Sequence, residues 1–379
     1  MKNGNPNVFL RIFTRTAPVF LLLAAASACD SQGVDYVPPD GVGADTGPNA
    51  DIDAFGGSDA GPGEDWWSGG VLGWRAEEIP IREAFFAISG VDNGPGYVVY
   101  VAGFRGAVLR YDSATGVWTD VSPTTTKAIR GIWAVGPKQV FICGDEGLLM
   151  RYEVPPGATY PEWTDASDPL PKETLHAVHG TGPDDVWVVG DNGLVLRNQG
   201  AGWVSIPKAD LLIPEDDTSD LHAVYARAPD DVLVSGEGMV IWWNGTEWDQ
   251  RDVEPSHGFL SIAGAGDQIW VGSDGGYLWS VVEGVWSEKP APVYYDYDAI
   301  WVAADGRVFA TGEHPSPQSI IWNGAGEPWD QLDVVSPEDL SEPWSVTPKS
   351  QITGLWGRSP EDIFACTQQQ QILHYAMHQ

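Results

Sequence analysis

Hydrophobic residues in this chain gather in short runs separated by turn-forming residues. Residues 175–207, for example, read LHAVHGTG, PDD, VWVVGDNG, LVLRNQGAG and WVSIP. This unit contains four runs rich in Val, Ile, Leu and Trp, and each run ends at Gly, Pro, Asn or Asp. Runs of β-branched and aromatic residues between such turn residues are typical of strands. The pattern therefore predicts a unit of four antiparallel strands.

Two sequence anchors indicate that this unit repeats along the chain. The first is a Trp that opens a strand with alternating polar residues: Trp74, Trp118, Trp163, Trp203, Trp248, Trp286 and Trp329. The second is a small residue followed by a branched apolar one: Ala87-Ile88, Gly131-Ile132, Ala177-Val178, Ala223-Val224, Ser261-Ile262, Ala299-Ile300 and Gly354-Leu355. A period of about 45 residues with four strands per unit is typical of a propeller blade, whereas the alternative, a stacked solenoid, usually has shorter repeats.

The two ends of the repeat region are expected to complete one blade together. Residues 352–379 supply three predicted strands and no Trp strand, and the missing strand is found over residues 73–80. Pairing of the two ends would remove open sheet edges. The sequence thus predicts an all-β fold, a seven-bladed β-propeller over residues 66–379 that is closed by its N-terminal strand.

The residues before the repeats predict export and a lipid anchor. Residues 1–28 resemble a bacterial lipoprotein signal peptide: basic residues precede the apolar run 17–26, which is shorter than the roughly 20 residues that span a bilayer. The small residues Ser27 and Ala28 come directly before Cys29, the predicted lipidation site. A plain signal peptide cut near Ala28 is the alternative.

The segment 29–65 is predicted to be a disordered tether. Residues 30–65 contain eight Asp, one Glu, eight Gly and four Pro, but no Lys or Arg. Such a composition cannot bury enough apolar surface to offset the entropy of ordering. The predicted location is the cell envelope of a Gram-negative bacterium, with lipid on the inner or the outer membrane and surface exposure left open.

Charge excludes one large class of partners. The chain has 53 Asp and Glu against 20 Lys and Arg, a formal net charge of −33, which repels the phosphates of nucleic acids. The sequence contains no G-x-S-x-G, H-E-x-x-H or C-x-x-C motif. No cofactor and no catalytic residue are therefore predicted.

A turn motif supports a resemblance to known propellers. The segments 144–147 and 190–193 share the pattern G-D-x-G between two predicted strands. In this respect residues 73–379 resemble Asp-box (BNR-type) propellers of the sialidase-like superfamily and the photosystem II assembly-factor propellers. The Asp box itself, S-x-D-x-G-x-T-W, is not met, and residues 273–276 come nearest to it. The resemblance implies a fold and leaves the function open.

Irregular segments around the sixth predicted blade supply the candidate ligand-binding residues. They carry residues that no blade pattern requires: Tyr294, Tyr295, Asp296, Tyr297, His314 and Trp344. Exposed aromatic residues beside acids are typical of sites for carbohydrates, cations or peptides. The alternative is that these aromatic residues pack within their own loops.

A second candidate site is the channel of the predicted propeller. The residue before each small-residue anchor is expected to face it: Phe86, Arg130, His176, His222, Leu260, Asp298 and Thr353. His176 and His222, on neighbouring blades, are candidate metal ligands. Two histidines alone are few for a metal site, and hydrogen-bonded channel residues are the alternative.

Repeat position assigns other reactive residues to the scaffold. The pairs Asp184-Asp185, Asp230-Asp231 and Glu361-Asp362 share one turn, and Arg110, Arg151 and Arg197 share one place in the third strands. Residues that recur in several blades are expected to stabilise the blade. Cys143 and Cys366 are predicted to be buried free thiols.

Two functions follow from these observations. The favoured one is a non-catalytic, monomeric, membrane-tethered propeller that binds a protein or a glycan of the cell envelope through one face. The alternative is a glycosidase of the sialidase type. It would require several arginines converging in the central funnel and two carboxylates roughly 5 to 10 Å apart.

Overall fold

The structure of this protein is a computed structural model that describes residues 71–251, 258–282, 284–290, 296–313, 320–323, 330–332 and 351–378. Residues Glu64–Gln379 form one compact unit. The predicted signal peptide, Cys29 and the predicted tether lie outside the described residues, as do Tyr294, Tyr295, His314 and Trp344. Within the described part of the chain, no helix is long and apolar enough to cross a membrane.

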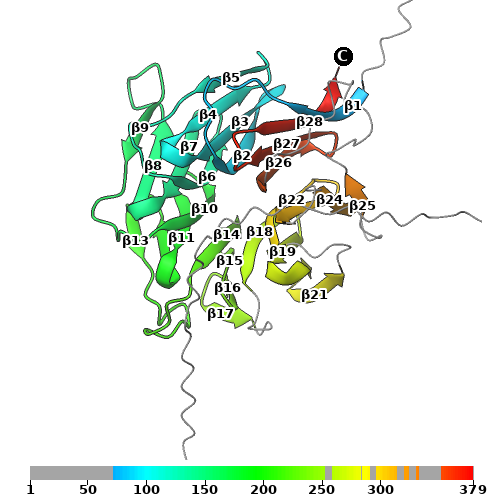
Figure 1. The fold of residues 1–379 in the computed structure, drawn as a ribbon. Helices are drawn as coiled ribbons and strands as arrows, with labels where there is room; N and C mark the ends of the chain where they lie inside the picture. Colours follow the sequence, from blue (N-terminus) through cyan, green and yellow to red (C-terminus); the bar gives the residue numbers. More distant parts are fainter. Residues whose placement is uncertain are drawn as a thin grey trace, which may run out of the picture. The chain divides into compact units, whose positions relative to one another are not determined.

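Six sheets are antiparallel meanders of four consecutive strands (Figure 1). The first three are β2 (Phe85–Asn93), β3 (Gly96–Gly103), β4 (Val108–Asp112) and β5 (Val117–Asp120); β6 (Ile129–Gly136), β7 (Gln139–Gly144), β8 (Leu148–Glu153) and β9 (Glu162–Asp165); and β10 (Leu175–Gly182), β11 (Asp185–Gly190), β12 (Leu194–Asn198) and β13 (Trp203–Ser205). The next three are β14 (Leu221–Ala228), β15 (Asp231–Gly236), β16 (Met239–Trp243) and β17 (Trp248–Arg251); β18 (Phe259–Ala265), β19 (Gln268–Ser273), β20 (Tyr277–Val282) and β21 (Val285–Pro290); and β22 (Asp296–Val302), β23 (Val308–Glu313), β24 (Ile320–Asn323) and β25 (Asp330–Leu332). Each of these blades is named below by its first strand.

The remaining sheet is composite and has the order β1-β28-β27-β26. Its strands are β26 (Ile352–Ser359), β27 (Asp362–Thr367), β28 (Ile372–His378) and β1 (Val71–Ala76). β1 pairs antiparallel with β28, from Val71 opposite His378 to Ala76 opposite Leu373. The sheet therefore joins the two ends of the described chain.

This arrangement corrects the predicted fold class. Seven blades were predicted, the last of them completed by the N-terminal strand, whereas six blades, not seven, are built from four consecutive strands. The described chain provides only three strands after residue 351, and the remaining sheet takes its fourth strand, β1, from the other end of the described chain. The strand expected over residues 73–80 is also displaced and ends at Ala76.

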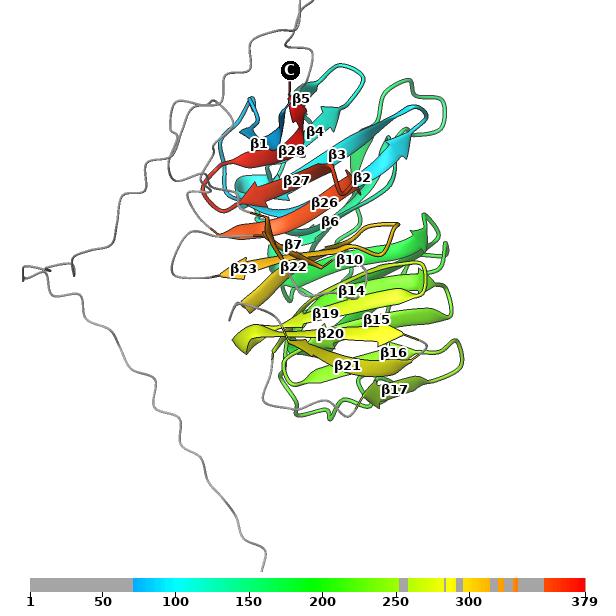
Figure 2. The same ribbon diagram turned by 90° about the vertical axis from the view of Figure 1, so that its right-hand side faces the viewer.

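The sheets surround a central axis, as Figures 1 and 2 show. The first strand of each sheet lies innermost and contacts the first strands of its two neighbours, and β26 contacts β2 in the same way. The all-β propeller is thus a ring of sheets whose inner wall is made of β2, β6, β10, β14, β18, β22 and β26.

Apolar side chains between neighbouring sheets form the core. The second strands are buried on both faces, and in β3 every residue from Val98 to Ala102 is fully buried. Tyr100 of β3 packs in one cluster with Ile132 and Tyr152 of the neighbouring β6 blade. Because each sheet buries both of its faces against other sheets, continuous apolar runs suit the second strands better than alternating ones.

The Trp anchors mark the fourth strands. Trp74, Trp118, Trp163, Trp203, Trp248 and Trp286 lie in β1, β5, β9, β13, β17 and β21, and Trp329 lies outside the described residues. In β9, the indole Nε1 of Trp163 donates a hydrogen bond to the backbone oxygen of Val121, 2.6 Å away in the preceding link. In β1, Trp74 is 3% exposed and packs on Tyr375 of β28.

Candidate functional site

A repeated irregularity in the inner strands creates the channel. In every sheet the register between the first two strands shifts just before the small-residue anchor. The residues skipped by the register are Phe86, Arg130, His176, His222, Leu260 and Thr353, and in β22 both Tyr297 and Asp298. A β-bulge redirects side chains that regular pairing would hold in the sheet. One skipped residue of each sheet therefore lines the channel, whereas Tyr297 is buried in the core.

The predicted ring of channel residues is confirmed. All of them line a single cavity of about 250 Å³: Phe86, Arg130, His176, His222, Leu260, Asp298 and Thr353. The guanidinium of Arg130 lies 5.3 Å from the ring centroid of Phe86, and Thr353 Oγ1 donates to the backbone oxygen of Phe85. Repeat spacing alone therefore located residues from seven different strands around one cavity.

His176 stands beside an aspartate of the G-D-x-G turn. Its Nε2 atom lies 2.6 Å from Oδ1 of Asp191 in the turn that follows β11. Partial burial acts to raise the pKa of the Asp191 carboxyl. The hydrogen bond and charge of His176, together with hydrogen bonds from Thr174, outweigh burial and hold that pKa below its usual range. His176 and Asp191 thus form a hydrogen-bonded pair at the channel mouth.

The turn itself explains how Asp191 reaches this position. A Cβ atom on Gly190 would lie 2.1 Å from the backbone oxygen of Thr174, so only glycine permits this close approach. Asn192 and Gly193 then adopt left-handed backbone conformations, with φ of 56° and 68°. The G-D-x-G motif therefore folds the chain tightly enough to place Asp191 against the start of β10.

A second carboxylate, that of Asp220, lies close to Asp191 and comes from the link to the next blade. Asp220, in the link before β14, accepts a hydrogen bond at Oδ1 from the backbone N–H of Asn192, 2.9 Å away. One ligand atom each from His176, Asp191 and Asp220 lies within 4.8 Å of the others. Within the described part of the chain, this is the one group of three or more His, Cys, Asp or Glu residues with donor atoms so close together.

His222 adjoins this cluster. Its ring centroid is 5.6 Å from that of His176, in an edge-to-face arrangement. Burial lowers the pKa of His222, and the neighbouring His176 lowers it further, against the opposing influence of nearby acids. The structure therefore brings the two predicted histidines together and adds two carboxylates. The sequence does carry a signal for Asp191. The channel residue and the aspartate of the following G-D-x-G turn are 15 residues apart in both units, Arg130 to Asp145 and His176 to Asp191.

Two of the candidate ligand-binding residues near the sixth blade, Asp296 and Tyr297, make contacts within the fold. Asp296 Oδ1 accepts a hydrogen bond from the backbone N–H of Gly275, 2.9 Å away. Tyr297 was expected in an exposed loop, and this expectation is wrong, because Tyr297 lies in β22 and is fully buried. Gly272 of β19 makes room for it, since a Cβ there would lie 2.7 Å from Cβ of Tyr297.

The recurrent charged residues contact their own sheets or the neighbouring ones. Arg110 pairs with Asp112 at 2.9 Å, Arg151 with Glu153 at 2.8 Å and Arg197 with Asp185 at 2.9 Å. Of the arginines that the structure describes, Arg130 is the one that lines the channel. Cys143 and Cys366 are free and buried, as predicted, and burial raises the pKa of each thiol.

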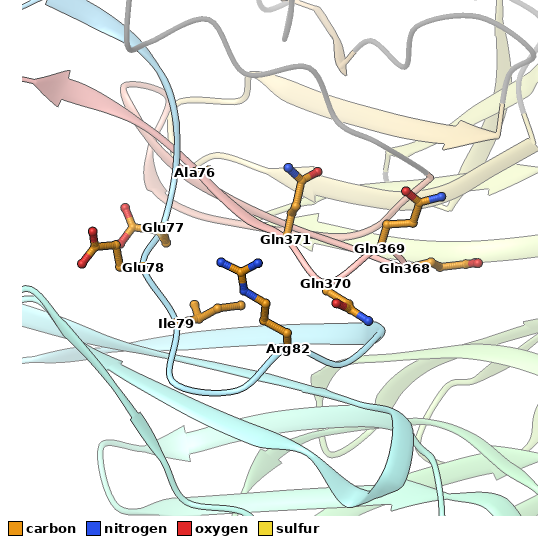
Figure 3. A pocket seen from close by; sticks show the side chains of 9 residues that line it. All are labelled: Ala76, Glu77, Glu78, Ile79, Arg82, Gln368, Gln369, Gln370 and Gln371. Carbon is orange, nitrogen blue, oxygen red and sulfur yellow. The ribbon is translucent and has the colours of Figure 1, made fainter.

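A larger pocket, of about 900 Å³, opens beside the composite sheet. It is lined by the link after β1 and by the turn between β27 and β28: Ala76, Glu77, Glu78, Ile79, Arg82, Gln368, Gln369, Gln370 and Gln371. Figure 3 shows the Arg82 side chain between the link and the turn of glutamines. Gln370 adopts a left-handed backbone conformation with φ of 64°. The sequence analysis did not single out this pocket, although four consecutive glutamines were visible.

Hydrogen bonds connect this pocket with the channel. Gln368 Nε2 donates to Oε1 of Gln351 at 2.6 Å, and Gln351 Nε2 donates to Oδ2 of Asp298 at 2.5 Å. Gln368 lines the pocket and Asp298 lines the channel. The pocket and the channel mouth therefore belong to one face of the propeller, the face that carries the turns between second and third strands.

Comparison with known proteins supports the fold. No family model matches the chain, and no curated protein matches it. Among solved structures, YCF48 bound to D1 peptide has a TM-score of 0.59 and 13% identity over 81% of this chain and 97% of that one. YCF48 from Cyanidioschyzon merolae has a TM-score of 0.60 and 15% identity over 80% of this chain and 99% of that one. The WD40 propeller domain of Doa1 has a TM-score of 0.60 and 10% identity, covering 82% and 98%. The chain is thus similar in fold to propellers, as the resemblance to the assembly-factor propellers implied.

Proposed function

We propose that this chain is a non-catalytic propeller that binds an extended segment of a protein in the cell envelope, while a lipid on Cys29 tethers it to a membrane. The segment binds to the face that holds the glutamine-lined pocket and the channel mouth. The pocket around Arg82 carries this proposal. The similarity in fold to YCF48, solved with a bound peptide, supports it.

The pocket offers the groups that a peptide backbone needs. A glutamine side chain both donates and accepts hydrogen bonds, which matches the N–H and C=O groups of an extended peptide. Among the residues that the structure describes, Arg82 and Glu78 have no hydrogen bond or ion pair with each other or with a neighbour. An unpaired guanidinium in a chain of net charge −33 is available to a carbonyl or carboxylate of the partner.

The arginine positions favour binding over glycoside hydrolysis. Arg110, Arg151 and Arg197 are paired with acids of their own sheets, and they do not line the channel. A glycosidase of the sialidase type would need its arginines to converge there. The channel instead contains Arg130, whose Nε donates to Asp145 at 2.8 Å.

Peptide selection tests the proposal. A random peptide library displayed on phage is enriched on the immobilised full chain, and the recovered peptides are measured by fluorescence anisotropy. We expect Arg82→Ala to weaken binding at least about tenfold, which corresponds to roughly 1.4 kcal/mol. The matched control is Arg358→Ala, because Arg358 is 41% exposed near the turn between β26 and β27, at the end of the sheet away from the pocket, and its ion pair with Asp92 is 3.8 Å long.

Two results would overturn the proposal. One is that no peptide is enriched, or that Arg82→Ala binds the recovered peptides as tightly as Arg358→Ala does. The other is binding to a glycan array without any peptide ligand, which would replace the protein partner by a glycan.

A further inference from the structure

We propose that His176, Asp191 and Asp220 bind one Zn²⁺ ion at the mouth of the channel. Their donor atoms come from two adjacent blades and lie within 4.8 Å of one another. This site is separate from the Arg82 pocket, and its test does not depend on the proposed peptide binding.

The donor set selects the metal. An imidazole nitrogen with two carboxylate oxygens is a ligand set typical of Zn²⁺, whereas Ca²⁺ and Mg²⁺ take oxygen ligands almost exclusively. Three protein ligands also leave one of the four tetrahedral positions open. That position would face the channel cavity of about 250 Å³ and accept a water molecule or a donor atom of a partner.

Backbone groups already orient both carboxylates. The N–H of Thr174 donates to Oδ2 of Asp191 at 3.2 Å, and the N–H of Asn192 donates to Oδ1 of Asp220 at 2.9 Å. Each aspartate therefore keeps one oxygen fixed by the backbone and one that can turn to the metal. Such outer contacts are the usual means of orienting metal ligands.

Only a small rearrangement is needed to close the site. Ligand atoms about 2.0 to 2.2 Å from a tetrahedral zinc ion are roughly 3.3 Å apart. His176 Nε2 and Asp191 Oδ1, now 2.6 Å apart, would separate slightly to admit the ion, and Asp220 would approach by side-chain rotation. The bulge at His176 and the tight turn at Asp191 hold the backbone in place meanwhile.

Comparison between repeats shows what is special here. In the β18 blade the same arrangement occurs, because Asp274 occupies the turn and Asp296 from the next blade accepts a hydrogen bond from Gly275. The bulged residue there is Leu260, which cannot bind a metal. In the β6 blade the bulged residue is Arg130, a cation paired with Asp145. Histidine between two such carboxylates occurs, among the described residues, at the β10 blade.

Titration with Zn²⁺ tests the site. The purified full chain is treated with a chelator, dialysed and titrated with ZnCl₂ in a calorimeter. We expect one ion per chain, and we expect Asp220→Asn and His176→Gln each to weaken binding at least about tenfold, since each removes one of three ligands. The matched control is Asp296→Asn, which removes the equivalent turn-capping carboxylate from a blade without a histidine and should leave zinc affinity unchanged.

Absorption spectroscopy distinguishes a variant that has lost the metal site from one that has lost its fold. Co²⁺ in a tetrahedral site of nitrogen and oxygen ligands gives visible absorption bands, which should form with the wild-type chain and disappear in Asp220→Asn while circular dichroism reports an intact fold. The proposal is wrong if the wild-type chain takes up no Zn²⁺. It is equally wrong if Asp220→Asn and Asp296→Asn bind the ion alike, or if Ca²⁺ competes with it at equal concentration.

Discussion

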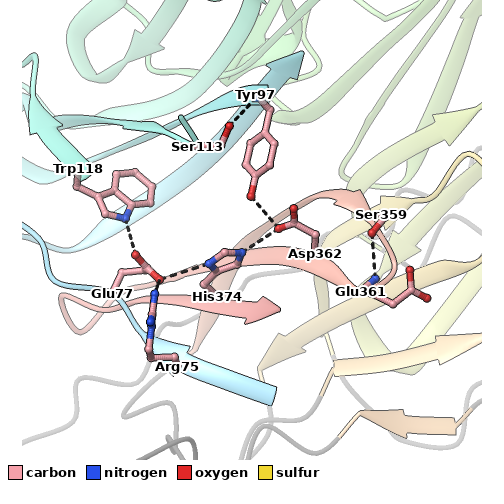
Figure 4. Close-up of polar contacts among 9 residues, drawn as sticks. All are labelled: Arg75, Glu77, Tyr97, Ser113, Trp118, Ser359, Glu361, Asp362 and His374. Atoms are coloured by element: carbon pink, nitrogen blue, oxygen red, sulfur yellow. Dashed lines mark hydrogen bonds and ion pairs between the residues drawn. The ribbon is translucent and has the colours of Figure 1, made fainter. Parts of the chain in front are cut away.

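Oε1 of Glu77 lies 3.4 Å from Nδ1 of His374, and both side chains are almost completely buried, at 5% and 8% exposure. Figure 4 shows that His374 stands between Glu77 and Asp362, with its Nε2 atom 2.8 Å from Oδ1 of Asp362. Trp118 Nε1 and Tyr97 Oη donate to the two carboxylates from the β2 blade. One polar cluster thus connects the link after β1 with β27, β28 and the neighbouring blade.

Removal of His374 should strongly destabilise the protein. His374→Gln would remove the cation shared by Glu77, which is buried, and Asp362, which is 25% exposed, and breaking a buried ion pair in this way costs about 3 to 5 kcal/mol. Arg75→Gln is the control, because Arg75 also pairs with Glu77 but is 51% exposed, and exposed pairs contribute about 1 kcal/mol or less. Urea unfolding at pH 6 measures both. Equal losses in the two variants would contradict the importance of the buried pair.

The same cluster predicts how stability depends on pH. Burial acts to lower the pKa of His374, but Asp362 and Glu77 outweigh it and raise that pKa, while His374 and Arg75 hold the pKa of Glu77 below its usual value against burial. The His374 contribution is therefore complete below the ordinary histidine pKa of about 6.5 and is lost as pH rises through the raised value. The Glu77 contribution is complete above about 4.5 and is lost as pH falls through the lowered value.

Unfolding free energy measured from pH 4 to 9 should accordingly be highest between about 4.5 and 6.5 and decline above that range, by at most about 1.4 kcal/mol per pH unit from this group. The His374→Gln variant should lack the alkaline decline. Tyr97 and Tyr111 also face the cluster, but burial raises the pKa of both, so they stay neutral over most of this range. The same alkaline slope in wild type and variant would assign it to another group.

Trp74 should contribute more to stability than any exposed residue of β1. Trp74→Ala removes a side chain that is 3% exposed and packs on Tyr375, and losses of about 3 to 5 kcal/mol are typical of such truncations. Leu72→Ala, in the same strand but 38% exposed, should cost well under about 1 kcal/mol. Chemical denaturation distinguishes them, and similar midpoints would mean that β1 adds little to the sheet.

Gly190 should tolerate no side chain. Gly190→Ala places a Cβ atom 2.1 Å from the backbone oxygen of Thr174, so the turn that holds Asp191 must shift, at a cost of roughly 2 kcal/mol or more. Gly182→Ala is the control, because nothing lies within 4 Å of a Cβ atom at that position. Thermal unfolding should separate the two variants. Indistinguishable melting temperatures would mean that the turn adapts freely.

Lipidation of Cys29 is tested by fractionation. If Cys29 carries the anchor, the wild-type chain should sediment with membranes and partition into detergent, whereas Cys29→Ala should be soluble or unprocessed. Acyl chains contribute about 0.8 kcal/mol per buried methylene, so the difference should be nearly complete. The same distribution for both forms would disprove the anchor.

The sequence predicted those features that repeat, and it failed where contacts are formed between distant residues. Repeat spacing placed His176 and His222 on one channel because each bulge comes at the same point of each unit. Asp220 was missed because its role depends on Asn192, 28 residues earlier and in another blade. Tyr297 was misplaced because an aromatic residue after a run of tyrosines looks like loop sequence, and only the opposing Gly272 reveals the space that buries it.

The pairing of β1 with β28 has a consequence for how the molecule is made. Arg75 and His374 face each other in that pair although they are separated by almost the whole length of the described chain. Of the described strands, β1 is therefore synthesised first and its partner β28 last. Contacts of such long sequence separation form late, and an unpaired strand edge is prone to aggregation until then. Ring closure must therefore follow the synthesis of β28, and β1 stays unpaired until then.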